Sequence, residues 1–513
     1  MRNVVRSSGW ALVIAMIGGC KGASPDVALS KKAVASDDEA AANVPVPSAD
    51  GPRLVALRPG IAVFDRASKS GQQLGALRLG GAVARAVEPY KVTESCPGGW
   101  YPVRPRGLVC ADETTSLLPA FTLPAPDASQ ALPHRYARLR TGTPLYTRIP
   151  TPDEQLENEP DLEKTLAKAK MDKPVTRAGS NDLPLDEHGN VDGLPVIKVG
   201  APGVGPDGRR SDASYFAFPL QGMAPPPPAG PVVSRPLRKG SGLAVIGTIP
   251  ATGPNGTRMF GVTVEGGYVP VDRLEPALGS TFAGVDLTKE KSLPVAFVLR
   301  HEVSPYEMKG GKAVRVEDEE IDRRASLFLT GRFRTIDAIR YDEAEDGKWY
   351  RGKDLIKVVK RSKVPDFVTD GVKWVDVSLA LQTMTLYEGK KPVFTTLVSS
   401  GADVLGDPAT SAATLQGTYK ITRKALSQAL DPLEVQSAHE VLDAPWYLEY
   451  APGFAFVGSF WSDPFGEARG HHDIALSPVD ARRLFQWAGP DVPEGWSWFA
   501  PSADETITVN VRK

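Results

Sequence analysis

The sequence predicts a mainly β protein made of several domains, and three observations support this prediction. The chain has 513 residues, which is too long for one compact core and suggests two to four domains. It contains 49 glycines and 46 prolines, which indicates many turns and several linkers. Segments with the spacing of strands, such as the one in which Val375, Val377 and Leu379 alternate with polar residues, far outnumber segments with helical spacing.

The overall composition is that of a soluble globular protein. Hydrophobic residues make up 42% of the chain, charged residues make up 24%, and the formal net charge is −1. A chain so close to neutrality gives no electrostatic reason to expect a nucleic acid or an acidic polymer as partner. We therefore expect no nucleic-acid binding.

Residues 1–19 have the features of a lipoprotein signal peptide. Arg2 and Arg6 precede a short apolar stretch at residues 10–17, which is too short to span a bilayer as a mature helix. The stretch is followed by Ile-Gly-Gly-Cys, which resembles a bacterial lipobox. The resemblance implies cleavage before Cys20 and a lipid on that cysteine. The alternative is an ordinary secretory signal with an incidental cysteine.

Residues 20–52 are predicted to form a disordered tether, because they lack aromatic residues and are rich in Ala, Ser, Pro and Asp. The lipobox implies a cell-envelope protein whose membrane contact is the N-terminal lipid. Lys21 follows the cysteine, and by resemblance to bacterial sorting signals this implies the outer membrane, with the protein facing the periplasm.

The remaining two cysteines, Cys96 and Cys110, lie in the exported part of the chain. Disulfides persist outside the cytoplasm, so we predict one bridge between them across a hairpin. The alternative is two reduced thiols. No cysteine follows Cys110.

Residues 53–118 alternate short apolar runs with turns, which predicts strand pairs. The ending Gly-Trp-Tyr-Pro-Val, then Gly-Leu-Val, resembles that of a bacterial SH3-like barrel. The resemblance implies binding of cell-wall peptide or of an envelope protein, and the alternative is a spacer. We predict that residues 119–231 form an irregular, proline-rich insertion with one exposed polar helix at 151–172. Residues 232–365 are predicted to hold further β-rich modules.

A short pattern recurs along these regions and indicates two or three related small barrels. It is Gly-Trp-Tyr at residues 99–101, Gly-Tyr-Val-Pro-Val at 267–271 and Lys-Trp-Tyr-Arg-Gly at 348–352.

Residues 366–513 are predicted to form a mostly β domain with one clear helix. Ser477 has the features of an N-cap, with Pro478 in the first turn and Asp480 three residues after the cap. The order of motifs, from Leu-Tyr-Glu-Gly through Leu-Val-Ser-Ser-Gly and Gly-Thr-Tyr to Phe-Trp and Leu-Ser-Pro, resembles the L,D-transpeptidase (YkuD-type) family. The resemblance implies peptidoglycan stem peptides as the partner, acyl transfer by a cysteine, and no cofactor or metal.

The family's Ser-His-Gly-Cys motif falls on Gly470, His471, His472 and Asp473. The resemblance therefore puts Asp473 where the family has its nucleophile. An upstream family histidine falls on Val457. The catalytic positions by resemblance are Asp473 and His471, both in a degenerate motif.

The same resemblance assigns four residues to a substrate cleft, namely Phe460, Trp461, Gly470 and His472.

Three functions follow from this motif. The first is a degenerate domain that binds peptidoglycan or a partner without turnover. The second is an active wall enzyme with an atypical mechanism. The third is a metal-dependent hydrolase that uses His471 and Asp473 with a third ligand, His439 or Asp463, because His and Asp side chains are zinc ligands.

Overall fold

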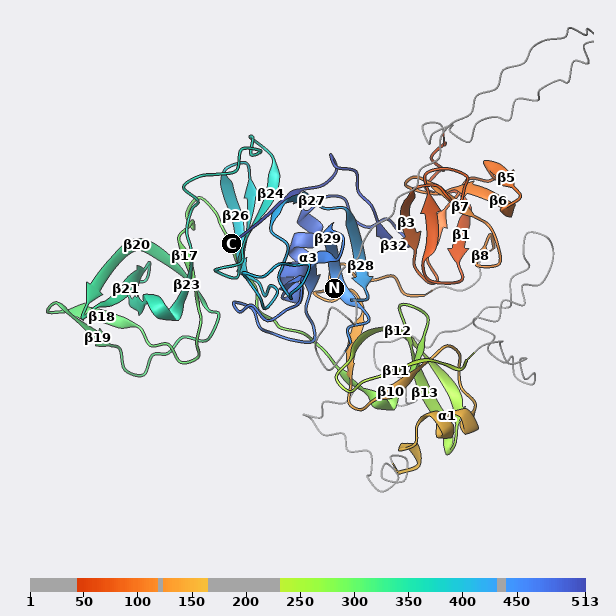
Figure 1. Cartoon of the computed structure of the whole chain (residues 1–513), viewed down its shortest axis with the longest axis horizontal. Helices are drawn as coiled ribbons and strands as arrows, with labels where there is room; N and C mark the ends of the chain where they lie inside the picture. Colours follow the sequence, from red (N-terminus) through yellow and green to blue (C-terminus); the bar gives the residue numbers. More distant parts are fainter. Residues whose placement is uncertain (1–43, 119–122, 165–230, 431–439) are drawn as a thin grey trace, which may run out of the picture.

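The computed structural model describes residues 44–118, 123–164, 231–430 and 440–513 (Figure 1). Strands dominate these residues and form several sheets, which confirms the predicted mainly β, multidomain fold. The predicted signal peptide, Cys20, most of the tether and His439 lie outside the described residues. Within the described part of the chain, no helix is long and apolar enough to cross a membrane.

The first β unit contains eight strands in two layers. They are β1 (Arg53–Ala56), β2 (Ile61–Phe64), β3 (Gln73–Leu77), β4 (Ala82–Ala84), β5 (Lys91–Thr93), β6 (Cys96–Pro102), β7 (Leu108–Cys110) and β8 (Thr115–Ser116). The strand order is β4-β1-β8 in one sheet, and β3-β2-β7-β6-β5 within the other. A bridge between Arg85 and Val103 connects the two layers. Buried Leu54, Val63 and Val109 form part of the core between them.

A disulfide between Cys96 and Cys110 joins β6 to β7, with the two Cα atoms 5.8 Å apart and 14 positions apart in sequence. Replacing both cysteines by serine is expected to lower the free energy of unfolding of this unit by about 3 kcal/mol, because a bridge of this span restricts the unfolded chain. Thermal unfolding with and without a reductant checks this. The reductant should destabilise the wild type and leave the double variant unchanged; a variant as stable as the oxidised wild type would contradict the prediction.

The second β unit corrects the predicted boundary at residue 231. Two strands, β9 (Arg135–Leu139) and β10 (Thr143–Tyr146), lie in the region predicted to be irregular. They pair with strands that follow residue 231, so residues 119–231 are not simply an insertion. The later elements are β11 (Val233–Leu237), β12 (Gly242–Gly253), β13 (Gly256–Thr263), β14 (Tyr268–Pro270), the 3₁₀ turn η3 (Val271–Arg273) and β15 (Leu274–Pro276). The order in the sheet is β11-β10-β14-β13-β12-β9-β15.

Helix α1 (Pro152–Asn158) lies within the predicted exposed helix but is shorter and is not wholly exposed. It begins with a capping box, in which Thr151 and Glu154 satisfy each other's backbone N–H groups. Gln155 is fully buried, and its side-chain amide donates to the carbonyl of Thr252 at 2.9 Å. Gln155 is thus the one buried side chain of α1, and residues 165–172 of the predicted helix lie outside the described residues.

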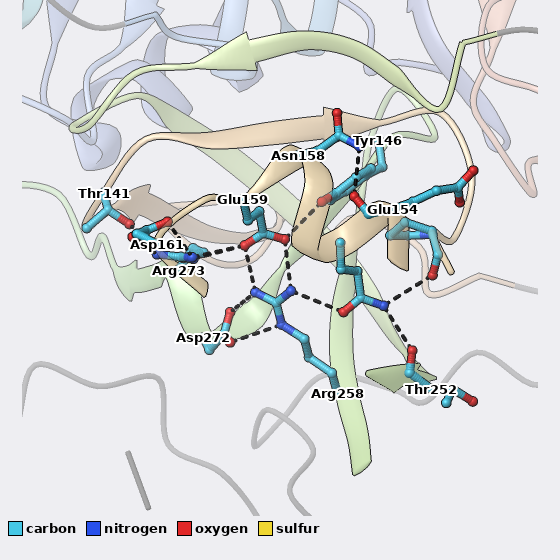
Figure 2. A network of polar contacts seen from close by, with 12 residues as sticks. Thr141, Tyr146, Glu154, Asn158, Glu159, Asp161, Thr252, Arg258, Asp272 and Arg273 are labelled. Atoms are coloured by element: carbon cyan, nitrogen blue, oxygen red, sulfur yellow. Dashed lines mark hydrogen bonds and ion pairs between the residues drawn. The ribbon is translucent and has the colours of Figure 1, made fainter. Parts of the chain in front are cut away.

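A buried charge network fixes the end of α1 to the sheet (Figure 2). Arg258 donates to the two carboxylate oxygens of Glu159 at 2.8 and 2.9 Å, and Arg273 donates to Glu159 at 3.2 Å. The Tyr146 hydroxyl donates to the same carboxylate at 2.9 Å. Asp272 accepts from the outer side of Arg258. Each of these buried charges therefore has a partner of opposite sign.

The third β unit is separate from the second, so residues 232–365 hold strands of two β units. It contains β17 (Val295–Val298), β18 (Tyr306–Lys309), β19 (Lys312–Arg315), β20 (Ser326–Ile336), β21 (Ile339–Ala344), β22 (Trp349–Arg351), the 3₁₀ turn η4 (Gly352–Asp354) and β23 (Leu355–Val358). The strand order is β19-β18-β22-β21-β20-β17-β23. The second and third units therefore have the same topology. When the strands of each unit are numbered along the chain, they are paired in the same order.

The first unit has the same strand order, except that two short strands, β4 and β5, take the place of the long strand β12. Three units therefore share one topology, although the recurring sequence pattern marks equivalent strands in only two of them. In the second and third units it falls on equivalent strands, β14 and β22. In the first unit the equivalent strand is β7, so Gly99–Tyr101 is not the matching segment. Aromatic residues on β6 gave a misleading match.

The C-terminal domain packs two sheets and one helix around a shared core. Its elements are β16 (Val285–Asp286), β24 (Lys373–Ser378), β25 (Thr383–Glu388), β26 (Lys391–Leu397), β27 (Gly417–Lys420), β28 (Arg423–Gln428), β29 (Ala444–Ala451), β30 (Phe454–Gly458), β31 (Ile474–Leu476), α3 (Pro478–Trp487), β32 (Trp496–Phe499) and β33 (Thr508–Arg512). The orders are β16-β26-β25-β24-β33-β27 and β31-β30-β29-β28-β32. Buried Val375, Leu448 and Phe485 belong to the core.

Helix α3 begins as predicted, because the Ser477 side chain accepts a hydrogen bond from the backbone N–H of Asp480 at 3.1 Å. Its apolar face, which includes Ala481, Leu484 and Phe485, is buried in the core. Asp480 itself is buried as well, and it accepts hydrogen bonds from Thr396 and from the backbone N–H of Gly284.

The three β units surround the C-terminal domain (Figure 1). The first unit extends one of its sheets, because β3 pairs with β32. The second contacts it through Phe460, whose ring lies 4.5 Å from that of Tyr136. The third packs Phe297 in one apolar cluster with Phe465. These contacts place the third unit beside the loop between β30 and β31.

Candidate functional site

A cleft of about 900 Å³ opens between the C-terminal domain and the third unit. Its lining residues are His301, Arg323, Ser399, Ala402, Ala412, Leu430, Val441, Val457, Trp461, Ser462, Asp463, Pro464, Glu467, Arg469, Gly470, His471, Asp473 and Ala475. Many predicted site residues therefore meet at one place. The volume lies in the range of about 300–1,000 Å³ that is typical of ligand pockets.

The backbone of the 470–475 segment is held against the turn that follows β26. Gly470 donates to the carbonyl of Ser400 at 2.8 Å, and its own carbonyl accepts from Ala402 at 2.9 Å. Ala475 and Ser399 exchange two hydrogen bonds of 2.8 Å. A Cβ on Gly470 would lie 3.2 Å from the Ser400 carbonyl oxygen, so a larger residue there needs a small shift.

Asp473 and Val457 both line the cleft. Val457 lies on β30 opposite Ala475 on β31, in a parallel pair, so Asp473 comes just before the paired segment. One carboxylate oxygen of Asp473 accepts a hydrogen bond from the backbone N–H of Ala455 at 3.0 Å. The apolar Val457 side chain offers no proton acceptor to a group at Asp473.

His471 also lines the cleft, and it lies two positions before Asp473 in the sequence. Burial lowers the pKa of its imidazole, and the neighbouring His472 lowers it further. The two rings lie 4.1 Å apart. Within the described residues, Nδ1 of His471 has no hydrogen-bond partner. A neutral imidazole with this free nitrogen can donate or accept a hydrogen bond, depending on its tautomer.

Two residues predicted for the cleft face elsewhere. His472 has a left-handed backbone, with φ of 58°, and its ring packs against Phe454 with centroids 4.9 Å apart. Its Nε2 atom lies 3.0 Å from the Ser411 carbonyl oxygen. Phe460 is buried against Tyr136 of the second unit. Neither of them lines this cleft, whereas Trp461 and Gly470 do.

The charged rim of the cleft was not predicted from the sequence. Arg323 of the third unit forms an ion pair of 2.7 Å with Glu467, and Arg469 forms another of 2.7 Å with the same carboxylate. His301, also from the third unit, lines the opening. Glu467 thus pairs with two cations, and Asp463 and Asp473 add two more carboxylates to the lining, so the cleft presents charges of both signs. No local motif marks Arg323 or His301, because only the packing of the third unit brings them to the cleft.

The predicted metal alternative has no support in the described part of the chain. No group of three or more His, Cys, Asp or Glu side chains there is arranged to hold a metal ion. Asp463 is engaged by Arg324 instead. His439, the other predicted third ligand, lies outside the described residues.

Comparison with protein families identifies the domain that carries the cleft. Residues 372–494 match the YkuD L,D-transpeptidase catalytic domain. This confirms the resemblance inferred from the motifs. The match includes Val457, Trp461 and Asp473, so one wall of the cleft belongs to the L,D-transpeptidase domain. No curated protein matches the chain.

Solved structures of L,D-transpeptidases resemble the chain over a limited part. The enzyme from Stackebrandtia nassauensis is 20% identical over 30% of this chain and 62% of its own, with a TM-score of 0.21. The enzyme from Xylanimonas cellulosilytica is 18% identical over 29% of this chain and 65% of its own, also with a TM-score of 0.21. The one from Mycobacterium smegmatis is 15% identical over 36% of this chain and 77% of its own, with a TM-score of 0.22. The chain spans less than two thirds of the length of the first two.

Proposed function

We propose that the L,D-transpeptidase domain binds peptidoglycan stem peptides in its cleft without transferring acyl groups. The observation that carries this proposal is Asp473, which lines the cleft at the position where the resemblance puts the family's cysteine. Val457 takes the position of a family histidine and lines the same cleft. The chain has three cysteines, at positions 20, 96 and 110, so none lies in the matched domain.

The chemistry of acyl transfer explains why these two changes matter together. The reaction needs a thiolate and a nearby imidazole that lowers its pKa or takes its proton. Attack by the Asp473 carboxylate on an unactivated amide would form a mixed anhydride, which is unfavourable because both nucleophile and leaving group are poor. The backbone N–H of Ala455, which donates to the Asp473 carboxylate, and the apolar Val457 do not offset that cost. What the site retains is a cleft of ligand size with Trp461 in its wall and charged groups of both signs at its opening.

The rest of the chain fits a protein that acts at the envelope. We propose that Cys20 carries a lipid that anchors the protein in the outer membrane, facing the periplasm. The three β units of equal topology would then be SH3-like modules that position the domain against the wall or bind an envelope protein. Incorporation of labelled fatty acid, abolished by Cys20→Ala, tests the anchor.

Binding and turnover are tested on one sample. The purified protein is incubated with isolated sacculi and with tetrapeptide muropeptides, and products are identified by mass spectrometry. We expect binding without cross-linked dimers. Trp461→Ala, which removes the aromatic wall, should weaken binding about tenfold. Trp487→Ala is the matched control, because Trp487 lies on α3 away from the cleft-lining residues.

Two outcomes would decide against this proposal. Dimers that disappear in Asp473→Ala would establish an active enzyme with an atypical mechanism. Equal binding by the Trp461 and Trp487 variants would place the binding surface elsewhere. In the opposite direction, Asp473→Cys combined with Val457→His should introduce acyl transfer into a cleft that already holds the peptide.

A further inference from the structure

A second cavity lies at the junction of the first unit, the second unit and the L,D-transpeptidase domain. Its volume is about 480 Å³, again within the usual range for small ligands. We call it the junction cavity. Arg58 comes from the first unit, Arg235 and Glu265 from the second, and Asp443 from the segment just before β29. It is distinct from the cleft, since the two share no lining residue.

Asp443 is unusual among the lining residues, because it is a carboxylate that is only 1% exposed. Its two carboxylate oxygens accept hydrogen bonds from the Ala244 backbone N–H at 2.9 Å and from the Ser427 hydroxyl at 3.3 Å. Both donors are neutral. Within the described residues, no Lys, Arg or His forms an ion pair with Asp443.

A buried carboxylate of this kind is costly without a cation, so such groups are normally paired or protonated. Burial raises the pKa of Asp443 to about 7, and the nearby Glu265 raises it as well. Two neutral hydrogen bonds leave room on the carboxylate for further donors, because it offers about four acceptor positions. The missing positive charge is therefore one that a ligand can bring.

The other charged groups of the lining restrict which cation fits. Glu265 adds a second carboxylate, which is more exposed than Asp443. Arg58 and Arg235 add two guanidinium groups, and Arg235 is held in place by an ion pair with Glu440. Guanidinium groups bind carboxylates in paired hydrogen bonds. The lining therefore offers both an anionic and a cationic partner, with apolar surface from Leu57, Leu145 and Leu442.

We propose that the junction cavity binds a small zwitterion, an amino acid or a short peptide with free ends. The ligand's ammonium group donates to Asp443, with Glu265 nearby, and its carboxylate accepts from Arg58 and Arg235. Because three parts of the chain line the cavity, the ligand also holds them in one arrangement. This inference does not depend on the activity proposed for the cleft.

Isothermal titration of the full chain with three related dipeptides tests the proposal. The probes are alanyl-alanine, its N-acetyl form and its C-terminal amide, used at about pH 7, where the α-amino group of the dipeptide is still charged and Asp443 is partly ionised. We expect binding of the free dipeptide, loss of at least about tenfold in affinity on N-acetylation, and a smaller loss on amidation. Equal affinity for the acetylated and the free dipeptide would overturn the proposal, as would the absence of any heat from the free dipeptide.

Variants connect the binding to the proposed carboxylate. Asp443→Asn keeps the shape of the side chain and an acceptor for Ala244, but it loses the charge, so the affinity for the free dipeptide should fall about tenfold. Glu275→Gln is the control, because this carboxylate lies on β15 of the second unit, which contributes to the cavity, but Glu275 itself is outside the cavity lining. If the Asp443→Asn protein is folded and binds the free dipeptide as tightly as the wild type does, the assignment of Asp443 as the ammonium-binding group is wrong.

Discussion

Replacing Glu159 by Gln is expected to lower the free energy of unfolding of the second unit by about 3–5 kcal/mol. Glu159 is 3% exposed and is the shared anion for Arg258 and Arg273, which are 7% and 2% exposed (Figure 2). Gln keeps the shape of the side chain but cannot balance two buried guanidinium groups. The loss is large because two buried cations lose the buried anion that they share and keep only the more exposed Asp272 and Asp161 as partners, not because the ion pairs were strongly stabilising on their own.

The measurement is denaturant unfolding, monitored by hydrogen exchange of the backbone amides in β12 and β13. These strands report on the second unit, because Arg258 lies on β13. Asp161→Asn is the matched control. Asp161 also pairs with Arg273, at 2.8 Å, but its side chain is 55% exposed, so its removal should cost less than about 1 kcal/mol. If the two variants lost equal stability, the buried position of Glu159 would not be the cause.

The C-terminal domain was predictable because its signals are local. The cap at Ser477 and the alternating pattern around Val375 depend only on nearby residues, and the structure has α3 and β24 there. The second unit was not predictable in the same way. Its strand β10 pairs with β11 on the far side of residues 165–230, and such a short strand depends on its neighbours more than on its own sequence.

The cleft was predicted in part for a related reason. Asp473, His471 and Trp461 follow from a motif, and the structure brings them together. Arg323 comes from a different unit, so no spacing in the sequence could indicate it. Phe460 was misassigned because an aromatic residue beside Trp461 fits a cleft wall and a domain interface equally well in sequence. Only the packing against Tyr136 separates the two.

Between about pH 4 and pH 7, the contribution of Asp443 to the free energy of unfolding is expected to decrease as the pH rises, opposite in sign to that of His134, whose pKa is lowered by burial to about 3. Its pKa is raised to about 7 in the folded protein by burial, against about 3.9 in an unfolded chain. In this window the folded state holds a proton on Asp443 that the unfolded state has released, so the stabilising contribution of Asp443 is full below pH 4 and is lost as the pH rises through 7. The raised pKa corresponds to about 4 kcal/mol over the whole window.

The comparison with Asp443→Asn isolates this contribution, because the variant has no group to titrate at that position. Asp480, with a pKa raised by burial to about 6, contributes in the same direction in both proteins and cancels in the difference. Glu265 and Tyr136 are the titratable groups that interact most closely with Asp443, and Arg423 lies near Glu265. We expect the variant and the wild type to be similarly stable near pH 4, and the variant to be the more stable above pH 7. A difference that stays constant from pH 4 to pH 8 would show that Asp443 keeps an ordinary pKa, with a cation supplied by another part of the chain.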